Sequence, residues 1–265
     1  MQREERKVFF RNTLSSYFDT FHDSLATDAG EWVVKGFIDV YRNIYTISID
    51  TKVVSKIVEL ILFPILSRFA HENDYQIVLS EHQNHYPDIS LIAPNNIKYA
   101  LDLKSTYRVS KRSVSGFTLG AFTGYFRKRT STKNITFPYR DYAAHYVLGV
   151  IYSRSENISD EREIYSLDDL QDIVSVIRDF DFLLQEKWEI ANDTPGSGNT
   201  KNIGSTKNIE ELINGKGPFA EYGEKVFDDY WMNYLTRDMA EAIDSDIPYR
   251  NLEQYWQWRQ RAPQK

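Results

Sequence analysis

A short segment of the chain combines two carboxylates, one amine and a turn. Between Pro87 and Lys104 the sequence reads PDISLIAPNNIKYALDLK, in which Asp88 follows a proline and Asp102 precedes a lysine by two positions. Side chains alternate between the two faces of a strand, so Asp102 and Lys104 share a face. Asparagine tolerates left-handed backbone angles, and a turn at 95–96 folds Asp88 back against Asp102.

Two carboxylates and an ammonium that converge in this way can cleave phosphodiesters with magnesium. Mg²⁺ prefers hard oxygen ligands and keeps several waters, so one or two carboxylates suffice when a substrate phosphate supplies another oxygen. The lysine can orient a water or stabilise the negative charge that builds on the phosphorus-centred transition state. The spacing alone also fits a solvated strand edge that carries an acid and a lysine, so both interpretations stay open on this segment.

A third acid lies in an apolar run of a predicted helix. The stretch from Thr51 to Phe69 contains IVELILFPIL, in which Glu59 is the single charge. Such a run is expected to be largely buried, and an ionised carboxylate is rarely buried without a partner or a metal. Glu59 is therefore either a paired carboxylate at the helix edge or a third acid that faces Asp88 and Asp102.

The order of these motifs resembles the EcoRV-type family of type II restriction endonucleases. The matching blocks are Asp50-Thr51-Lys52-Val53, Glu59, Gln83-Asn84-His85-Tyr86-Pro87-Asp88, Asp102-Leu103-Lys104 followed by Ser105-Thr106-Tyr107, Phe117-Thr118-Leu119-Gly120, Thr132-Lys133-Asn134-Ile135, Gly196-Ser197-Gly198-Asn199-Thr200, Asn202-Ile203-Gly204-Ser205 and Asp229-Tyr230-Trp231. The resemblance covers residues 34–206 well and the rest loosely. Several unrelated motifs in one order make it specific, whereas a lone PD…DxK pattern would indicate only the broad PD-(D/E)xK nuclease superfamily.

The resemblance implies an α/β fold, with a restriction-endonuclease-like mixed β-sheet flanked by helices, an inserted DNA-binding part and C-terminal helices. It implies a single domain over residues 1–265, with the catalytic core at 34–155 and the DNA-recognition part at 180–265. The implied activity is Mg²⁺-dependent hydrolysis of double-stranded DNA at a short palindrome, GATATC, leaving blunt ends and a 5′-phosphate. The implied partners are double-stranded DNA, a second copy of the chain in a homodimer, and a cognate DNA methyltransferase.

The resemblance also implies residue roles. Asp88 and Asp102 bind the metal, Lys104 supports the attacking water, and Glu59 is an auxiliary acid and a further metal ligand. The segment 196–200 enters the major groove and reads base edges, while Gln83 and its neighbour lie along the minor groove. The residues expected to contact DNA are Gln83, Asn84, Thr106, Lys133, Gly196, Ser197, Gly198, Asn199, Thr200 and Lys201.

Three features depart from the family pattern. The hairpin between Asp88 and Asp102 is shorter, Lys201 brings a charge where the family has a neutral residue, and His82 replaces an amide beside Gln83. None of the three removes a catalytic group. Both charge changes are expected to alter salt dependence or the preference for flanking bases.

Composition limits the possible classes of protein. The 265 residues include no cysteine, which excludes disulfides and thiolate metal sites. The sequence has no apolar run long enough to span a membrane and no secretory start, so a cytoplasmic protein is expected. The net charge of −6 argues against a nonspecific nucleic-acid binder. Basic residues nevertheless cluster at 104–112 and 127–133, as a phosphate-binding track or as solvated loops.

Two other functions fit parts of the sequence. A structure-specific repair or junction-resolving nuclease of the same superfamily would retain Asp88, Asp102 and Lys104 but would recognise DNA shape. A noncatalytic DNA-binding protein would retain the basic stretches and lack an acid. The blocks at 83–86 and 196–200 favour the site-specific nuclease.

Periodicity and turn residues predict a mixed arrangement of helices and strands. The expected elements are a helix over 5–27, a hairpin of 34–40 with 44–49, a helix from Thr51 capped by Asp50 and bent or broken at Pro64, a buried strand over 144–153, a helix over 167–177, a strand or extended segment over 180–190, and helices over 207–214, 222–241 and 250–261. Without the resemblance, 191–205 would be a flexible surface loop because it is rich in small and polar residues.

Overall fold

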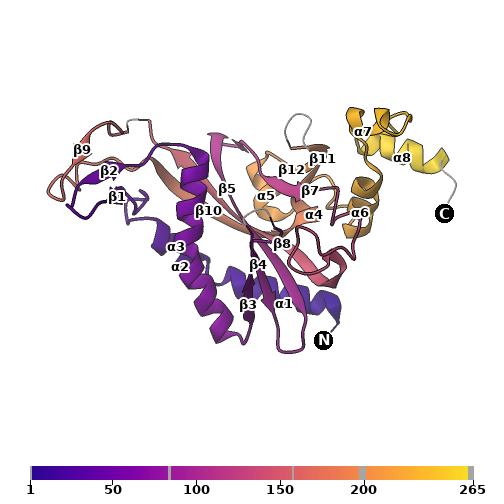
Figure 1. The fold of residues 1–265 in the computed structure, drawn as a ribbon, viewed down its shortest axis with the longest axis horizontal. Helices are drawn as coiled ribbons and strands as arrows, with labels where there is room; N and C mark the ends of the chain where they lie inside the picture. The colour runs from indigo at the N-terminus through magenta and orange to yellow at the C-terminus, as the bar shows by residue number, and fades with distance from the viewer. Residues whose placement is uncertain (1, 83–84, 157, 197–200, 262–265) are drawn as a thin grey trace. The chain divides into compact units, whose positions relative to one another are not determined.

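The computed structural model of the chain describes residues 2–82, 85–156, 158–196 and 201–261 (Figure 1). The described chain forms two compact units. The first unit comprises Met1–Ile77, Leu103–Ser115 and Leu148–Leu184, and the second comprises Val78–Asp102, Gly116–Val147 and Gln185–Lys265. The expected division into a catalytic core at 34–155 and a recognition part at 180–265 is a functional one and stays a prediction.

Helices and strands mix in both units, as the sequence predicts. The first unit contains α1 (Arg3–Ser15), α2 (Phe18–Leu25), β1 (Gly36–Ile38), β2 (Ile44–Thr46), α3 (Thr51–Glu72), β6 (Ser113–Val114) and β9 (Ile164–Tyr165). The second contains β4 (Ile89–Ile92), β7 (Thr118–Ala121), the 3₁₀ turn η1 (Tyr139–Asp141), α4 (Lys187–Ile190), β11 (Ala191–Pro195), β12 (Asn202–Ser205), α5 (Ile209–Asn214), α6 (Glu224–Asn233), α7 (Arg237–Glu241) and α8 (Leu252–Arg261). The strands β3 (Gln76–Leu79), β5 (Lys98–Ser110), β8 (Tyr142–Arg154) and β10 (Ile177–Glu186) each carry residues of both units.

The strands form three sheets. The largest has the order β10-β8-β5-β4-β3, with β6 paired to β5. A three-stranded sheet in the first unit has the order β1-β2-β9, and one in the second has the order β11-β12-β7. The expected hairpin of 34–40 with 44–49 is confirmed, since Gly36 pairs with Thr46 and Ile38 with Ile44 in antiparallel register.

Helix α3 begins where the sequence predicts. The Asp50 carboxylate accepts hydrogen bonds from the backbone N–H groups of Lys52 at 2.8 Å and Val53 at 3.2 Å, which satisfies two donors of the first turn. The helix continues past Pro64 to Glu72, so the expected break at the proline is wrong. Within the described ranges, no helix is long and apolar enough to cross a membrane.

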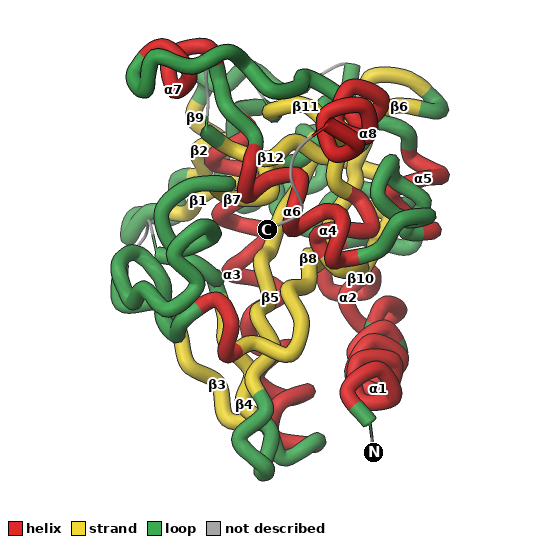
Figure 2. The backbone as a smooth tube through the Cα atoms, turned by 90° about the vertical axis from the view of Figure 1, so that its right-hand side faces the viewer, coloured by secondary structure: helices red, strands yellow, loops and turns green. Residues whose placement is uncertain are grey.

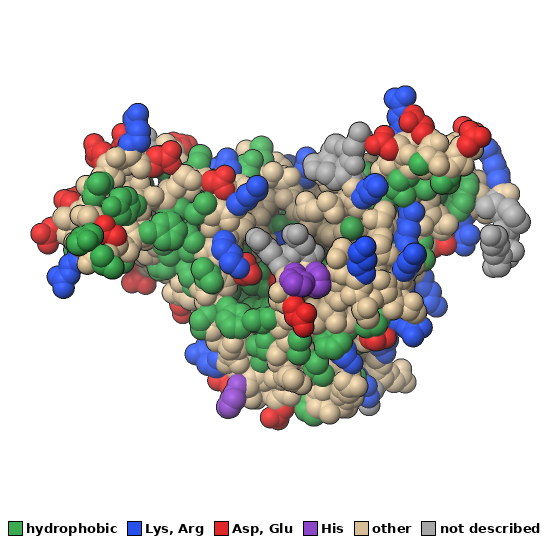
Figure 3. Space-filling view, viewed as in Figure 1, with side chains coloured by type: hydrophobic (Ala, Val, Ile, Leu, Met, Phe, Trp, Pro, Cys, Tyr) green, Lys and Arg blue, Asp and Glu red, His purple; other side chains and the backbone are tan. Residues whose placement is uncertain are grey.

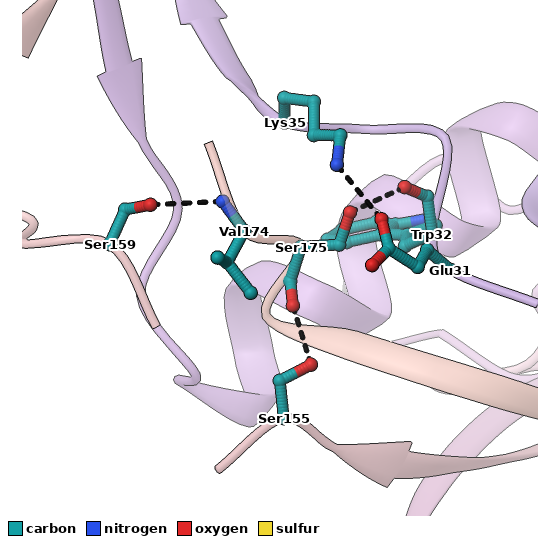
Figure 4. A network of polar contacts seen from close by, with 7 residues as sticks. All are labelled: Glu31, Trp32, Lys35, Ser155, Ser159, Val174 and Ser175. Carbon is teal, nitrogen blue, oxygen red and sulfur yellow. Dashed lines mark hydrogen bonds and ion pairs between the residues drawn. The ribbon is translucent and has the colours of Figure 1, made fainter. Parts of the chain in front are cut away.

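The expected helix over 167–177 is wrong, and polar contacts of the first unit explain why (Figure 4). The buried hydroxyl of Ser175 donates to the Trp32 carbonyl oxygen at 2.8 Å, and Ser155 donates its hydroxyl to the Ser175 carbonyl oxygen at 2.5 Å. The Val174 N–H donates to the Ser159 hydroxyl at 2.9 Å. The Val174 N–H is thereby used for a bond to a side chain, whereas a helix over 167–177 would need it for its own ladder.

Other elements differ from the expectation in their ends. The helix expected over 5–27 is two helices, α1 and α2, separated at Ser16 and Tyr17. The helix expected over 222–241 is likewise α6 and α7, separated at 234–236. The strand expected over 180–190 ends at Glu186, where α4 begins. The expected helices over 207–214 and 250–261, and the buried strand over 144–153, are confirmed as α5, α8 and β8.

Aromatic side chains fill the core of each unit. In the first unit the rings of Phe10, Phe69 and Tyr75 contact one another with centroids 5.6 to 6.0 Å apart. In the second, Tyr230 is the centre of a cluster whose other members are Trp231, Tyr234, Tyr249 and Tyr255. The Tyr230 hydroxyl donates to the Asp193 carbonyl oxygen at 2.6 Å, which fastens β11 to this cluster.

Candidate active site

The hairpin of β4 and β5 positions the two predicted carboxylates (Figure 2). The strands are antiparallel, and Ile89 pairs with Leu101 at the end of the ladder. Asp88 directly precedes that pair on one strand and Asp102 directly follows it on the other, so the two acids occupy the next opposing positions. The turn uses Asn96 at a φ of 62°, and its N–H donates to the Ala93 carbonyl oxygen at 2.8 Å. The predicted turn and register are confirmed.

The two acids differ in their exposure. Asp102 is 4% exposed, whereas Asp88 is half-buried at the start of β4. Lys104 lies two positions beyond Asp102 on β5, on the same face of the strand, and is half-buried. Its Nζ donates to the Leu103 carbonyl oxygen at 3.2 Å. The sequence therefore predicts correctly that Asp102 and Lys104 share one strand face.

Buried tyrosines of the second unit surround Asp102. Burial raises the pKa of Tyr86 well above its ordinary value, and the nearby Tyr139 and Asp102 raise it further. Burial, and then the Asp102 carboxylate, likewise raise the pKa of Tyr125. The rings of Tyr86 and Tyr125 stack with centroids 5.3 Å apart, and the Tyr86 hydroxyl lies 2.9 Å from Nδ1 of His145. The raised pKa values keep both tyrosines of this stacked pair neutral at physiological pH.

Sequence reasoning missed Lys187, which belongs to this cluster. Lys187 is the first residue of α4 and is 2% exposed. Its Nζ lies 4.1 Å from the centroid of the Tyr86 ring. The signal in the sequence is weak, because a lysine between Glu186 and Trp188 at the end of an apolar strand is usually an exposed residue.

Glu59 lies on α3 in the first unit. Its side chain is 38% exposed and forms an ion pair with Lys56 at 3.0 Å, as a paired carboxylate at the helix edge would, while Ile57, Val58, Leu62, Ile65 and Leu66 of the same run are buried. Leu60 is also exposed. One turn earlier on the same face of α3, the Ser55 hydroxyl lies 2.7 Å from that of Ser105 on β5. The role of Glu59 as a third acid stays a prediction.

Several residues of the two basic stretches point to protein groups. Arg108 donates to the Asp179 carbonyl oxygen and to the Asp181 carboxylate. Arg127 donates to the Tyr234 carbonyl oxygen, and Arg129 pairs with Asp228 at 2.6 Å. These side chains stabilise the units in which they lie. Lys133, by contrast, is exposed in a turn.

The segment expected as a loop over 191–205 is largely a hairpin. Ala191 of β11 pairs with Ser205 of β12, and Pro195 pairs with Ile203. The Gly196 N–H donates to the Asn202 carbonyl oxygen at 3.0 Å, and a Cβ on Gly204 would meet the Gly196 Cα at 2.8 Å. The stem is therefore a close approach of two backbones that requires glycine.

Strand β7 supports this hairpin from the other side. Asn202 pairs with Ala121 and Gly204 with Thr118, so the block at 117–120 and the block at 202–205 are neighbours in one sheet. The Lys201 carbonyl oxygen accepts a hydrogen bond from the Phe122 N–H at 3.0 Å, and the Lys201 side chain is exposed.

The remaining DNA-contact predictions divide into two groups. Thr106 is 3% exposed, and its Oγ1 has no hydrogen-bond partner among the residues that the structure describes, so its burial does not favour direct DNA contact. The others lie outside the described residues; they are Gln83, Asn84, Ser197, Gly198, Asn199 and Thr200.

Comparison with known proteins identifies the family. The family described as restriction endonuclease EcoRV matches residues 28–260. The chain is also 36% identical over 239 residues to the type II restriction enzyme EcoRV of Escherichia coli, which covers 89% of this chain and 94% of that protein. The chain belongs to the EcoRV family of restriction endonucleases.

As a member of this family, the protein is a type II restriction enzyme, a site-specific deoxyribonuclease that acts on DNA. The family resemblance and the restriction-endonuclease-like fold expected from it are confirmed. Of the three functions that the sequence left open, membership of the EcoRV family supports the site-specific nuclease. The chain is also similar to a solved structure, the NlaIV restriction endonuclease, with a TM-score of 0.41 at 11% identity, over 92% of this chain and 95% of that one.

Proposed function

We propose that this EcoRV-family enzyme hydrolyses double-stranded DNA at GATATC with Mg²⁺, leaving blunt ends with 5′-phosphates. The main support for metal-dependent hydrolysis is the register of β4 with β5, which puts Asp88 and Asp102 at opposing positions. In the proposed reaction a water oxygen bonds to phosphorus, the bond to the 3′ oxygen breaks, and the 3′ oxygen takes up a proton. The recognition sequence rests on the family resemblance.

The donor set suits Mg²⁺. Among the described residues, no group of three or more His, Cys, Asp or Glu side chains could hold a metal ion. Asp88 and Asp102 supply two carboxylates, and Mg²⁺ accepts such a sparse set because it keeps its waters and binds a substrate phosphate oxygen. When bound, the ion would supply positive charge to the phosphate and lower the pKa of a coordinated water.

The protein groups have separate tasks. Asp88 and Asp102 hold the metal, and Lys104 orients the attacking water or stabilises the charge that develops on the phosphate, because its ammonium shares the strand face of Asp102. Glu59 is an auxiliary acid, and its position one turn beyond Ser55, which contacts β5, supports this role. The half-exposed carboxylate of Glu59 is able to exchange Lys56 for another cation.

DNA is read by the hairpin of β11 and β12 and by the stretch before β4. The stem at Gly196 presents residues 197–200 to base edges in the major groove, and Lys201 and Lys133 contact phosphates. Gln83 and Asn84 lie along the minor groove. Thr106 is a buried residue of β5 in the first unit, and we do not propose a direct contact between its hydroxyl and DNA.

A palindromic site requires two-fold symmetry, so we infer a homodimer in which each subunit cuts one strand. Exposed apolar side chains gather over the sheet β1-β2-β9, at the left of Figure 3, and this surface is the proposed dimer interface. Its members are Phe37, Ile38, Val40, Tyr41, Tyr45 and Ile164. A DNA methyltransferase of the same specificity would protect the host DNA.

The test is cleavage of a plasmid of known sequence with Mg²⁺, followed by sequencing of the ends. We expect cuts at GATATC alone, blunt ends that ligate without repair, and no cleavage when Mg²⁺ is chelated. Asp88→Asn and Asp102→Asn should each lose at least about 100-fold in rate while remaining folded, since even outer-shell changes cost 10–100-fold. Ends at another sequence would overturn the target, and parental rates in either variant would overturn the metal site.

A further inference from the structure

Lys187 is a buried cation in the unit that carries Asp88 and Asp102. Among the described lysines and arginines of that unit, it is the one that is buried, with 2% of its surface exposed. Removing an ammonium from water is costly, so a buried lysine persists only where its surroundings compensate the charge. The contacts of Lys187 therefore indicate what the charge stabilises.

The ammonium rests on aromatic faces. Nζ of Lys187 lies 4.1 Å from the Tyr86 ring centroid and 5.8 Å from that of Tyr139. The negative faces of these rings stabilise a cation. His145 holds the Tyr86 ring in place, with Nδ1 2.9 Å from the Tyr86 hydroxyl and Nε2 3.2 Å from the Tyr139 carbonyl oxygen.

A glycine leaves room for this amine. Gly120 has a φ of +86°, and a Cβ there would lie 3.2 Å from the Tyr125 hydroxyl and 3.5 Å from Nζ of Lys187. The amine and the Tyr125 hydroxyl thus converge on the same glycine. Gly120, the last residue of the block at 117–120, is therefore needed for structure. Glycine adopts this positive φ readily, and its missing side chain leaves the space that the amine and the hydroxyl approach.

The tyrosines that meet Lys187 also lead to the two acids. Tyr86 is separated from Asp88 by one residue, and its backbone is fixed by hydrogen bonds from its N–H to the Asn134 carbonyl oxygen at 3.1 Å and from the Thr136 N–H at 2.9 Å. Asp88 opposes Asp102 across the β4–β5 ladder, so the position of this backbone also sets the distance between the two acids. The contact of Lys187 with the Tyr86 ring therefore leads to the pair of opposing carboxylates.

We propose that Lys187 is a positioning residue for the metal site, whose buried ammonium holds the segment Tyr86–Asp88 in the geometry that the metal requires. The inference rests on the proposed metal-binding function of Asp88 and Asp102. Two carboxylates on adjacent strands repel each other before a cation arrives. When Lys187 already holds the Tyr86–Asp88 segment in place, less of the metal's binding free energy is used to bring the acids together.

The experiment compares Lys187→Met with the parent in two measurements. The first is the Mg²⁺ concentration that gives half-maximal single-turnover cleavage, and the second is the Ca²⁺ affinity of the DNA-bound protein by calorimetry. We expect both to weaken by about 10-fold, the size of outer-shell effects on metal sites, with the rate at saturating Mg²⁺ within about threefold of the parent. Lys187→Arg should recover most of the loss because it retains the charge.

Two controls separate positioning from simple folding. Lys7→Met removes a lysine that is 4% exposed in the first unit, and should lower thermal stability without changing metal dependence. Lys187→Gln replaces Lys187→Met in both measurements if the latter does not fold. Parental or tighter metal binding in the charge-free variant, or equal losses in Lys187→Met and Lys187→Arg, would overturn the proposal. Retained Ca²⁺ binding in Asp102→Asn would instead overturn the metal site itself, whatever Lys187 does.

Discussion

Lys104 differs from the other lysines near the site because it shares a strand face with Asp102. If its ammonium acts on the attacked phosphate, Lys104→Ala should lower the single-turnover cleavage rate by at least about 100-fold, as loss of one charge-stabilising donor does. Its effect on DNA affinity measured with Ca²⁺ should be less than about threefold. Rapid-quench cleavage and a binding titration give the two numbers.

Lys133 provides the matched control for Lys104. It is exposed in a turn, so Lys133→Ala should weaken DNA binding, lower the salt dependence of binding by about one ion and leave the saturated cleavage rate unchanged. Equal losses of rate and affinity in Lys104→Ala would make Lys104 a phosphate-binding residue rather than a catalytic one.

The residues that could be predicted from sequence are those whose positions depend on local rules. The placement of Asp88 against Asp102 follows from strand alternation and from one asparagine turn, both encoded within a single segment. Lys187 could not be predicted, because its burial depends on rings that come from distant parts of the chain, Tyr86 and Tyr139. The sequence left Glu59 either as a paired carboxylate at the helix edge or as a third acid, because an apolar run does not tell which side of a helix faces solvent.

Among the elements, the hairpin of β11 and β12 depends on close packing of two glycines. A Cβ at Gly204 would meet the Gly196 Cα at 2.8 Å and the Thr194 carbonyl oxygen at 3.1 Å, and neither is a flexible side chain. Gly204→Ala should therefore lower the free energy of unfolding by about 1–3 kcal/mol, as overpacking does. It should also reduce the preference for the cognate site over single-base-pair variants, with little effect on random DNA.

The measurements are chemical denaturation and a cleavage panel at one fixed salt concentration. Lys207→Ala is the control, because Lys207 is exposed just beyond β12. A Gly204→Ala enzyme with parental stability and discrimination would mean that the stem tolerates the extra methyl group and does not set the position of the reading segment.

The elements that the sequence misassigned have non-local partners. The stretch 191–205 is rich in small polar residues, but its stem forms strands because β7 supplies hydrogen-bond partners more than 70 positions earlier in the chain. The stretch 167–177 has a helical pattern of apolar residues, and Ser175 instead bonds to Trp32. The helix from Thr51 was predictable because its cap, Asp50, is adjacent in sequence.

At the scale of the whole molecule, the exposed sheet β1-β2-β9 is expected to join two copies of the chain. Val40 is 89% exposed and Ile38 is 59% exposed. A charge introduced at either position would be buried without a partner in an interface. Ile38→Asp should therefore convert the enzyme from dimer to monomer in sedimentation velocity, and should abolish concerted cutting of both strands.

Val8 offers a control for the dimer prediction, since it is an equally exposed apolar residue of the first unit on α1. Val8→Asp should leave the sedimentation coefficient and double-strand cleavage unchanged. A dimer that survives Ile38→Asp and Val40→Asp would exclude this sheet as the interface.

Buried tyrosines should limit stability at alkaline pH in both units. Burial raises the pKa of Tyr142 and of Tyr152 to about 12, above the ordinary value of about 10. The pKa of each of these tyrosines is higher in the folded protein than in the unfolded one. Their contribution to the free energy of unfolding is therefore fully present below pH 10 and is lost as the pH rises towards 12. The free energy of unfolding should fall between about pH 10 and pH 12.

Urea titrations at several pH values measure this fall, and Tyr142→Phe should make it shallower. The same variant loses the hydrogen bond of 2.7 Å between Tyr142 and Ser90, so its stability at neutral pH should be lower. An unfolding free energy that stays constant up to pH 11 would contradict the assigned tyrosine pKa values.

The stem of the β11–β12 hairpin has a consequence for engineering. Its register is fixed by pairing with β7, by the bond from Gly196 to Asn202 and by the bond from Tyr230 to Asp193, all of which lie outside residues 197–200. The described contacts alone are therefore enough to fix the stem. A combinatorial library confined to 197–200 should yield mostly folded enzymes with altered outer-base preferences, whereas the same diversity placed at 202–205 should yield mostly unfolded ones.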